Sequence, residues 1–217
     1  MPIVIENLGF RFGSRVLFDN FSCELREGQI TGFVGPSGSG KSTLLAVLAG
    51  AERPQSGTVT YPASLRRGRS VLQERIAWMT QTAPLMLRRS ALANVSIPLH
   101  GRGVERGRRS GIAMASLELM DMEHFADESC IRLSGGERQR VAMARAVASE
   151  VALLLADEPT SALDKANRAR LLTSLRAVAG RGTIVVVATH DLAVVSACDE
   201  VVDLEHRALA SRDNSIS

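Results

Sequence analysis

The chain has 217 residues, of which 45% are hydrophobic and 23% are charged. This composition is typical of a folded α/β protein and excludes a disordered, collagen-like or disulfide-stapled chain, and the length predicts one domain. The net charge of +3 is weak evidence for a nucleic-acid partner, so we expect none. The three cysteines lie far apart and away from histidines, which indicates neither a zinc site nor a disulfide framework.

The apolar stretches are short. None approaches the ~18 residues that a membrane-spanning helix needs, and the longest clear runs are 151–156 and 184–188. The first residues, Met1 to Glu6, lack the basic segment, long apolar stretch and cleavage site of a secretory signal. We therefore expect a cytoplasmic chain that forms no pore by itself.

The first clear element is the apolar run 30–34, which predicts a strand. A glycine-rich loop follows, and leucines at helical spacing then continue to Gly50. Two glycines five apart, followed by Lys and Ser, match the pattern of a phosphate-binding loop. The residues of this motif are Gly35, Pro36, Ser37, Gly38, Ser39, Gly40, Lys41, Ser42 and Thr43.

The chemistry of this loop suits a triphosphate. Its glycines allow successive backbone N–H groups to turn toward the phosphates, and the helix N-terminus adds partial positive charge. Lys41, one of only two lysines in the chain, would supply a mobile charge for the β- and γ-phosphates. The Ser42 hydroxyl would bind Mg²⁺. The alternative is a glycine-rich turn with an incidental lysine.

Residues 82–130 contain no apolar run of the kind expected for a buried strand. Ile112, Ala115, Leu119 and Met122 fall on one helical face, which predicts a helical insertion. Within it, residues 102–109 hold four arginines. We interpret them as a solvated loop and helix start, with a contact to acidic headgroups or an acidic partner surface as the alternative.

A second helix start follows the insertion. Ser134 and, three residues later, Glu137 predict a capping box. Gly135 and Gly136 at the same place also favour an anion site. Because the chain already has a phosphate loop, a second such site far along one domain indicates that the ligand is shared between two copies.

The runs 151–156 and 183–188 are continuously apolar, which is typical of central parallel strands covered on both faces. A helical pattern over 167–179 separates them, so we expect a doubly wound α/β sheet. Asp157 and Glu158 follow the first run and His190 follows the second. All three side chains should therefore lie at the carboxyl edge of the sheet, where ligands bind.

These three residues suit the chemistry of phosphoryl transfer. Asp157 is the natural partner of Mg²⁺. Our hypothesis is that Glu158 polarises the attacking water and that His190 hydrogen-bonds the γ-phosphate. The alternatives are that Asp157 and Glu158 cap the turn before Pro159 and that His190 is structural.

Several motifs resemble, in order and spacing, those of the nucleotide-binding subunit of ATP-binding cassette (ABC) transporters. They are the phosphate loop, Gln81, 133–139, 155–159, 161–164 and His190. The resemblance implies an α/β P-loop NTPase core with a mainly parallel central sheet, an N-terminal antiparallel β portion and a helical insertion. It covers one domain over 1–217, with the core at 1–81 and 131–217 and a helical subdomain at 82–130.

The resemblance further implies an ATPase that uses ATP and Mg²⁺ as a head-to-tail homodimer. ATP would lie between the phosphate loop of one copy and 134–137 of the other, where Glu137 replaces the commoner glutamine. Gln81 would sense Mg²⁺ and the attacking water, and Ser161 and Asp164 would contact the second copy. Phe12 would stack on adenine, with Phe10 as the alternative.

The implied partners are integral membrane permease subunits on the cytoplasmic face of the membrane, with no nucleic acid. Residues 94–99 and the short C-terminus are similar to the branch that exports lipoproteins, macrolides, antimicrobial peptides and haem, so we expect export. One alternative is an ABC ATPase without transport, in cell division or iron–sulfur assembly. Another, a P-loop kinase, leaves 133–137 unexplained.

Overall fold

The computed structural model describes residues 1–67, 70–71, 75–79, 85–161 and 163–205. Its centre is a five-stranded sheet in which every pairing is parallel. The strands are β3 (Ile30–Val34), β7 (Ile76–Met79), β8 (Leu153–Asp157), β9 (Ile184–Thr189) and β10 (Glu200–Asp203). Their order is β10-β3-β9-β8-β7, so the two predicted apolar runs form adjacent central strands, β8 and β9.

A second sheet is antiparallel and comes mainly from the N-terminal part of the chain. It contains β1 (Ile3–Phe12), β2 (Arg15–Leu25) and β4 (Ser56–Thr60), in the order β2-β1-β4. Two short strands, β5 (Arg66–Arg67) and β6 (Ser70–Val71), form a separate antiparallel pair. The predicted fold class, a parallel α/β core with an N-terminal antiparallel portion, is confirmed.

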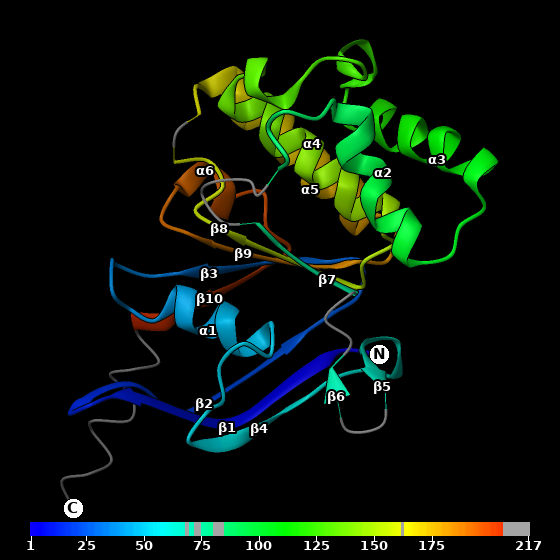
Figure 1. Cartoon of the computed structure of the whole chain (residues 1–217). Helices are drawn as coiled ribbons and strands as arrows, with labels where there is room; N and C mark the ends of the chain where they lie inside the picture. Colours follow the sequence, from blue (N-terminus) through cyan, green and yellow to red (C-terminus); the bar gives the residue numbers. More distant parts are fainter. Residues whose placement is uncertain (68–69, 72–74, 80–84, 162, 206–217) are drawn as a thin grey trace, which may run out of the picture.

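The helices form layers around the parallel sheet (Figure 1). Helix α1 (Lys41–Leu48) lies between the two sheets, whereas α4 (Gly135–Ala148) and α5 (Lys165–Ala179) cover the other face. Helices α2 (Ala91–Gly101) and α3 (Arg106–Glu118) pack on α4. The short elements are α6 (Leu192–Val195) and the 3-10 turns η1 (Ala63–Leu65), η3 (Glu123–Phe125) and η4 (Cys130–Arg132).

The alternation of side chains along β9 explains why its sequence is apolar throughout. Ile184 and Val186 belong to the core between the sheet, α1 and the antiparallel strands. Val185 and Val187 belong to the core beneath α4 and α5. Because both faces of the strand are covered, neither set can be polar.

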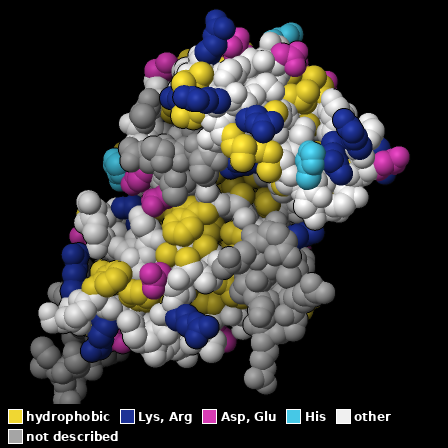
Figure 2. All heavy atoms as spheres, in the orientation of Figure 1, with side chains coloured by type: hydrophobic (Ala, Val, Ile, Leu, Met, Phe, Trp, Pro, Cys, Tyr) yellow, Lys and Arg dark blue, Asp and Glu magenta, His cyan; other side chains and the backbone are white. Residues whose placement is uncertain are grey.

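The surface view agrees with this layering. Figure 2 shows hydrophobic side chains gathered between the helices above and the antiparallel sheet below, with Lys and Arg side chains scattered over the rest of this face. Within the described ranges, no helix combines the length and apolar character of a membrane span.

Helix α3 lies where the sequence predicts a helix. Of the four apolar residues that share the predicted helical face, Met122 is buried and Ile112 is half-buried. Ala113, Leu117 and Met120 are buried, whereas Ala115 and Leu119 are exposed. Ile112 and Ala115 border an open hollow of about 620 Å³ beside the ends of α4 and α5. The predicted apolar face is therefore only partly covered.

Candidate functional site

The predicted phosphate loop connects β3 to α1 at the carboxyl edge of the parallel sheet. Gly40 has a φ of +97°, and a Cβ added there would lie 2.6 Å from Phe18 Cζ, so this position requires glycine. No side chain caps the N-terminus of α1. The backbone N–H groups of its first turn are therefore suited to bind an anion.

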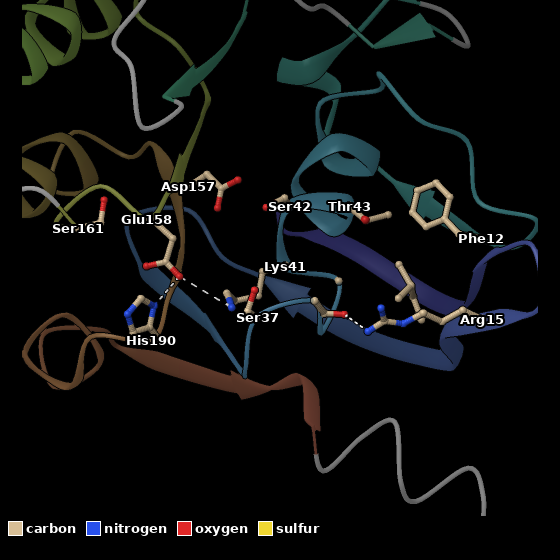
Figure 3. A pocket seen from close by; sticks show the side chains of 13 residues that line it. Phe12, Arg15, Ser37, Lys41, Ser42, Thr43, Asp157, Glu158, Ser161 and His190 are labelled. Carbon is tan, nitrogen blue, oxygen red and sulfur yellow. Dashed lines mark hydrogen bonds and ion pairs between the residues drawn. The ribbon is translucent and has the colours of Figure 1, made fainter.

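A pocket of about 580 Å³ opens over this loop (Figure 3). It brings together residues of the phosphate loop, the β1–β2 hairpin and the segments after β8 and β9. They are Phe12, Arg15, Leu17, Ser37, Gly38, Gly40, Lys41, Ser42, Thr43, Asp157, Glu158, Ser161 and His190. Gly35, Pro36 and Ser39 of the predicted motif lie outside this lining.

Lys41 lies at the floor of the pocket with only 8% of its side chain exposed. Its Nζ donates hydrogen bonds to the carbonyl oxygens of Gly35 at 2.7 Å and Pro36 at 3.1 Å. The same atom is 3.8 Å from Glu158 Oε1. The loop therefore holds a positive charge within reach of the carboxylate that follows β8.

Glu158 is held in place by contacts with the segment that ends β9. Its Oε1 lies 2.8 Å from His190 Nδ1, and the Thr189 hydroxyl donates to its Oε2 at 3.5 Å. Its backbone N–H donates to Ala188 O at 2.9 Å. The φ of Glu158 is +46°, a left-handed conformation that is costly for a non-glycine residue. The expected meeting of Asp157, Glu158 and His190 at one sheet edge is present in the geometry (Figure 3).

The pocket offers a donor set that fits Mg²⁺. Ser42 and Asp157 both line it, one with a hydroxyl and the other with a carboxylate. Magnesium is commonly held by one or two such protein oxygens, together with water and substrate phosphates. In the described part of the chain, no group of three or more His, Cys, Asp or Glu could form a metal cage of its own. Gln81 lies outside the described residues.

The second predicted anion site forms the start of α4. Ser134 Oγ accepts from the Glu137 backbone N–H at 3.3 Å, and Glu137 Oε2 accepts from the Ser134 N–H at 2.7 Å, which completes the predicted capping box. The hydrogen bond from the Ser134 backbone lowers the pKa of Glu137. Residues 134–137 are not part of the pocket lining.

Asp164 is the N-cap of α5. Its carboxylate accepts from the Asn167 backbone N–H at 2.8 Å and from Asn167 Nδ2 at 3.0 Å. The bond from the Asn167 N–H is the main cause that lowers the pKa of Asp164. Asp164 is exposed and lies outside the pocket lining, whereas Ser161 lines it.

The two alternatives for an adenine contact differ in exposure. Phe12 is 59% exposed and lines the pocket. Phe10 is 4% exposed and packs in the core, with the centre of its ring 5.2 Å from that of Phe12. Phe12 is therefore the better placed of the two.

The arginine-rich segment 102–109 makes contacts within the protein. Arg102 donates to Ala148 O at 3.2 Å and pairs with Glu150. Arg109 Nε donates to Val104 O at 2.7 Å. These contacts give Arg102 and Arg109 a structural role in joining α2, α3 and the end of α4.

Sequence reasoning missed residues that support the site. Asp191 Oδ2 accepts from the Thr160 hydroxyl at 3.1 Å and lies 3.0 Å from Arg168 Nε. Arg15 Nη2 donates to Gly38 O at 2.8 Å. The only signal for Asp191 is its place directly after His190, and Arg15 lies 23 residues from its partner.

A family model described as "ABC transporter" matches residues 18–161. A probable sulfate/thiosulfate import ATP-binding protein of Chlorella vulgaris is 38% identical over 95% of this chain and 88% of its own length. A Fe(3+) ions import ATP-binding protein of Streptomyces coelicolor is 35% identical over 98% of this chain, and a methionine import ATP-binding protein of Bordetella avium is 38% identical over 84%. This chain spans only 60% and 52% of those two proteins.

Solved structures give the same picture. A putative metal-chelate type ABC transporter in an inward-facing conformation matches with a TM-score of 0.78 and 32% identity, over 93% of this chain and 78% of that one. The cbiO1 subunit from Clostridium perfringens, part of the cbiONQ complex, matches with a TM-score of 0.83 and 25% identity, over 93% and 83%. A bacterial ABC transporter cassette, solved as a dimer, matches with a TM-score of 0.77 and 29% identity, over 93% of each chain.

Proposed function

Since the chain belongs to the ABC transporter family and is an ATPase that binds ATP, we propose that two identical copies close head to tail around Mg-ATP and drive transport through separate permease subunits. The observation that carries this proposal is the position of Glu158. Its Oε1 lies 2.8 Å from His190 Nδ1 and 3.8 Å from Lys41 Nζ, on the wall of the pocket.

The nucleotide would be held along the length of this pocket. Lys41 and the N–H groups at the start of α1 would bind the β- and γ-phosphates. The exposed ring of Phe12 would stack on adenine. Ser42 and Asp157 would hold Mg²⁺, which when bound neutralises negative charge on the phosphates. Gln81 would help to hold Mg²⁺ and the attacking water.

Hydrolysis would depend on the segments that follow β8 and β9. Glu158 would accept a proton from the attacking water, while His190 would donate a hydrogen bond to the γ-phosphate. The contact between these two side chains fixes both on the same wall of the pocket. Catalysis of this reaction rests mainly on such positioning and on charge stabilisation.

The second copy would complete the site. The start of α4, with Ser134 and Gly135 exposed, presents the partial positive charge of a helix N-terminus but does not line the pocket of its own chain. Ser134, Gly135, Gly136 and Glu137 would therefore bind the γ-phosphate held by the partner. Ser161 and Asp164 would contact the partner beside it. A related cassette solved as a dimer supports this assembly.

Import is the direction that the relatives favour. The three curated relatives described above are all named as import ATP-binding proteins, so the expected export has no support among them. We therefore propose an importer subunit attached to permeases at the cytoplasmic face of the membrane. In this subunit, 82–130 forms the helical subdomain, and 1–81 and 131–217 form the core.

Replacing the proposed general base tests the whole scheme. Glu158→Gln should bind ATP, lose turnover and accumulate as an ATP-dependent dimer, measured by light scattering after size-exclusion chromatography. Lys41→Ala is the control and should bind no ATP and stay monomeric. A Glu158→Gln protein that hydrolyses ATP normally, or that stays monomeric with ATP bound, would overturn the proposal.

A further inference from the structure

Arg15 lies over the phosphate loop next to the proposed adenine contact. Phe12 ends β1 and Arg15 begins β2, and the two residues pair directly across the hairpin. Both line the nucleotide pocket, and Figure 3 shows them together at the end of the pocket away from Glu158 and His190. The Arg15 guanidinium reaches the loop itself, where Nη2 donates to Gly38 O at 2.8 Å.

Within the described part of the chain, no acidic side chain pairs with this guanidinium, and no carboxylate lies within 4.0 Å of it. Its hydrogen bond to Gly38 goes to a neutral carbonyl, and with the described residues it uses one of the five N–H groups of an arginine. A full positive charge with free donors therefore faces a pocket that is suited to phosphates.

Arg15 and Lys41 hold the loop at different points. Lys41 Nζ binds the carbonyl oxygens of Gly35 and Pro36, close to Glu158, whereas Arg15 binds that of Gly38, close to Phe12. If Lys41 serves the β- and γ-phosphates, the phosphate on the adenosine side must lie nearer to Arg15. Arginine also suits phosphate better than lysine, because its planar fork can make two parallel hydrogen bonds.

We propose that Arg15 binds the α-phosphate of the nucleotide. This inference rests on the proposed function, since it assumes that the pocket holds ATP with its adenine at Phe12. The bond to Gly38 keeps the guanidinium pointed at the loop before the nucleotide arrives. Gly38 contributes to this arrangement, because a Cβ added there would lie 3.1 Å from Arg15 Nη2.

The test compares ADP, AMP and adenosine, none of which carries the γ-phosphate that ATP hydrolysis releases. Their dissociation constants are measured by competition with a fluorescent ADP analogue, for the wild type and for Arg15→Met and Arg15→Lys. We expect Arg15→Met to raise the dissociation constants of ADP and AMP by a similar factor of about ten, the loss typical of one charge-assisted hydrogen bond. The dissociation constant of adenosine should not change. Arg15→Lys should recover part of the loss, since it keeps the charge.

Arg11→Met is the matched control. Arg11 precedes Phe12 on β1 and is exposed, but it does not line the pocket, so the same change of charge there should leave all three affinities unchanged. Thermal melting of each variant shows that the fold is retained.

The outcomes separate this inference from the function on which it rests. A wild type that fails to bind ADP refutes the proposed function. If the wild type binds ADP and Arg15→Met binds ADP with the same affinity, only the role of Arg15 is refuted. If Arg15→Met loses affinity for ADP alone, the contact lies on the β-phosphate and the assignment is overturned. An equal loss of affinity for adenosine would also overturn it.

Discussion

Glu158 and His190 are 32 residues apart in the chain, yet Oε1 of one lies 2.8 Å from Nδ1 of the other. The pairing follows from the parallel sheet. Strands β8 and β9 are neighbours in register, with Asp157 opposite Ala188, so the residues that follow each strand emerge side by side. The contact thus depends on backbone pairing and needs no further element to bring the two side chains together.

The first prediction concerns the His190 side of this contact. His190→Ala should reduce ATP hydrolysis by roughly a hundredfold, a typical loss for one hydrogen-bond donor to transition-state charge, with little change in ATP affinity. Steady-state turnover and nucleotide titration measure the two effects. His124→Ala is the control, because His124 is highly exposed and does not line the pocket. Normal turnover in His190→Ala would show that the imidazole is structural.

The second prediction uses the left-handed backbone of Glu158, whose φ is +46°. Glycine adopts this conformation without strain, so Glu158→Gly should be more stable than Glu158→Ala by about 1 kcal/mol, although both should lack turnover. Urea unfolding gives the comparison. At Ala169, an exposed residue of helix α5, the order should reverse, with Ala169→Gly less stable by about 1 kcal/mol. If Glu158→Ala were as stable as Glu158→Gly, the backbone at this position would not be strained.

The third prediction concerns Gly40, where a Cβ would clash with Phe18 and φ is +97°. Gly40→Ala should lose about 2–4 kcal/mol of stability, because overpacking adds to backbone strain, and its ATP affinity should fall. Gly182→Ala is the matched control: φ is +89° there, but nothing lies within 4 Å of the added Cβ. Urea unfolding of both variants isolates the cost of the clash. Equal losses would mean that Phe18 moves aside freely.

The fourth prediction concerns the ion pair of Asp191 with Arg168, in which both side chains are half-buried. Because Asp191 directly follows His190, breaking the pair should let the His190 segment shift. Asp191→Asn should slow hydrolysis and leave ATP affinity unchanged. A double-mutant cycle with Arg168→Met should give a coupling energy of about 1 kcal/mol in urea unfolding. Additive losses would show that the pair does not couple the segments.

The sequence predicted the parts of the site that depend on local pattern or on strand direction. The phosphate loop is a contiguous motif, and Asp157, Glu158 and His190 each follow an apolar run, so their common edge needed only the parallel sheet. Arg15 was missed because its role depends on the register of β1 with β2 and on a partner 23 residues away.

Long-range contacts account for the other misses. Gln139 Nε2 donates to Pro159 O at 2.9 Å and so joins α4 to the turn that carries Glu158, a pairing that no sequence period reveals. On α3, the predicted apolar face is only partly covered, because Ile112 and Ala115 border an open hollow. Helical spacing identifies a helix, but it does not tell a covered apolar stripe from an uncovered one.

The fifth prediction concerns Glu137, whose pKa the Ser134 backbone N–H lowers from its ordinary value of 4.5. A carboxyl whose pKa is lower in the folded state stabilises the fold at pH above 4.5, and this stabilisation disappears as pH falls through the folded pKa. Glu137→Gln keeps an acceptor for the N–H but has no charge at the start of α4. It should be less stable than the wild type by about 0.5 kcal/mol at pH 7, and this deficit should shrink as the pH falls below 4.5.

Urea unfolding between pH 3 and pH 7 measures this difference. Glu118→Gln, at the end of α3, is the control for the loss of one negative charge. A negative charge near a helix C-terminus is unfavourable, so its removal there should not destabilise the protein at pH 7. A deficit of Glu137→Gln that stays constant across this pH range would mean that the capping box acts through hydrogen-bond geometry and that the charge of Glu137 contributes nothing.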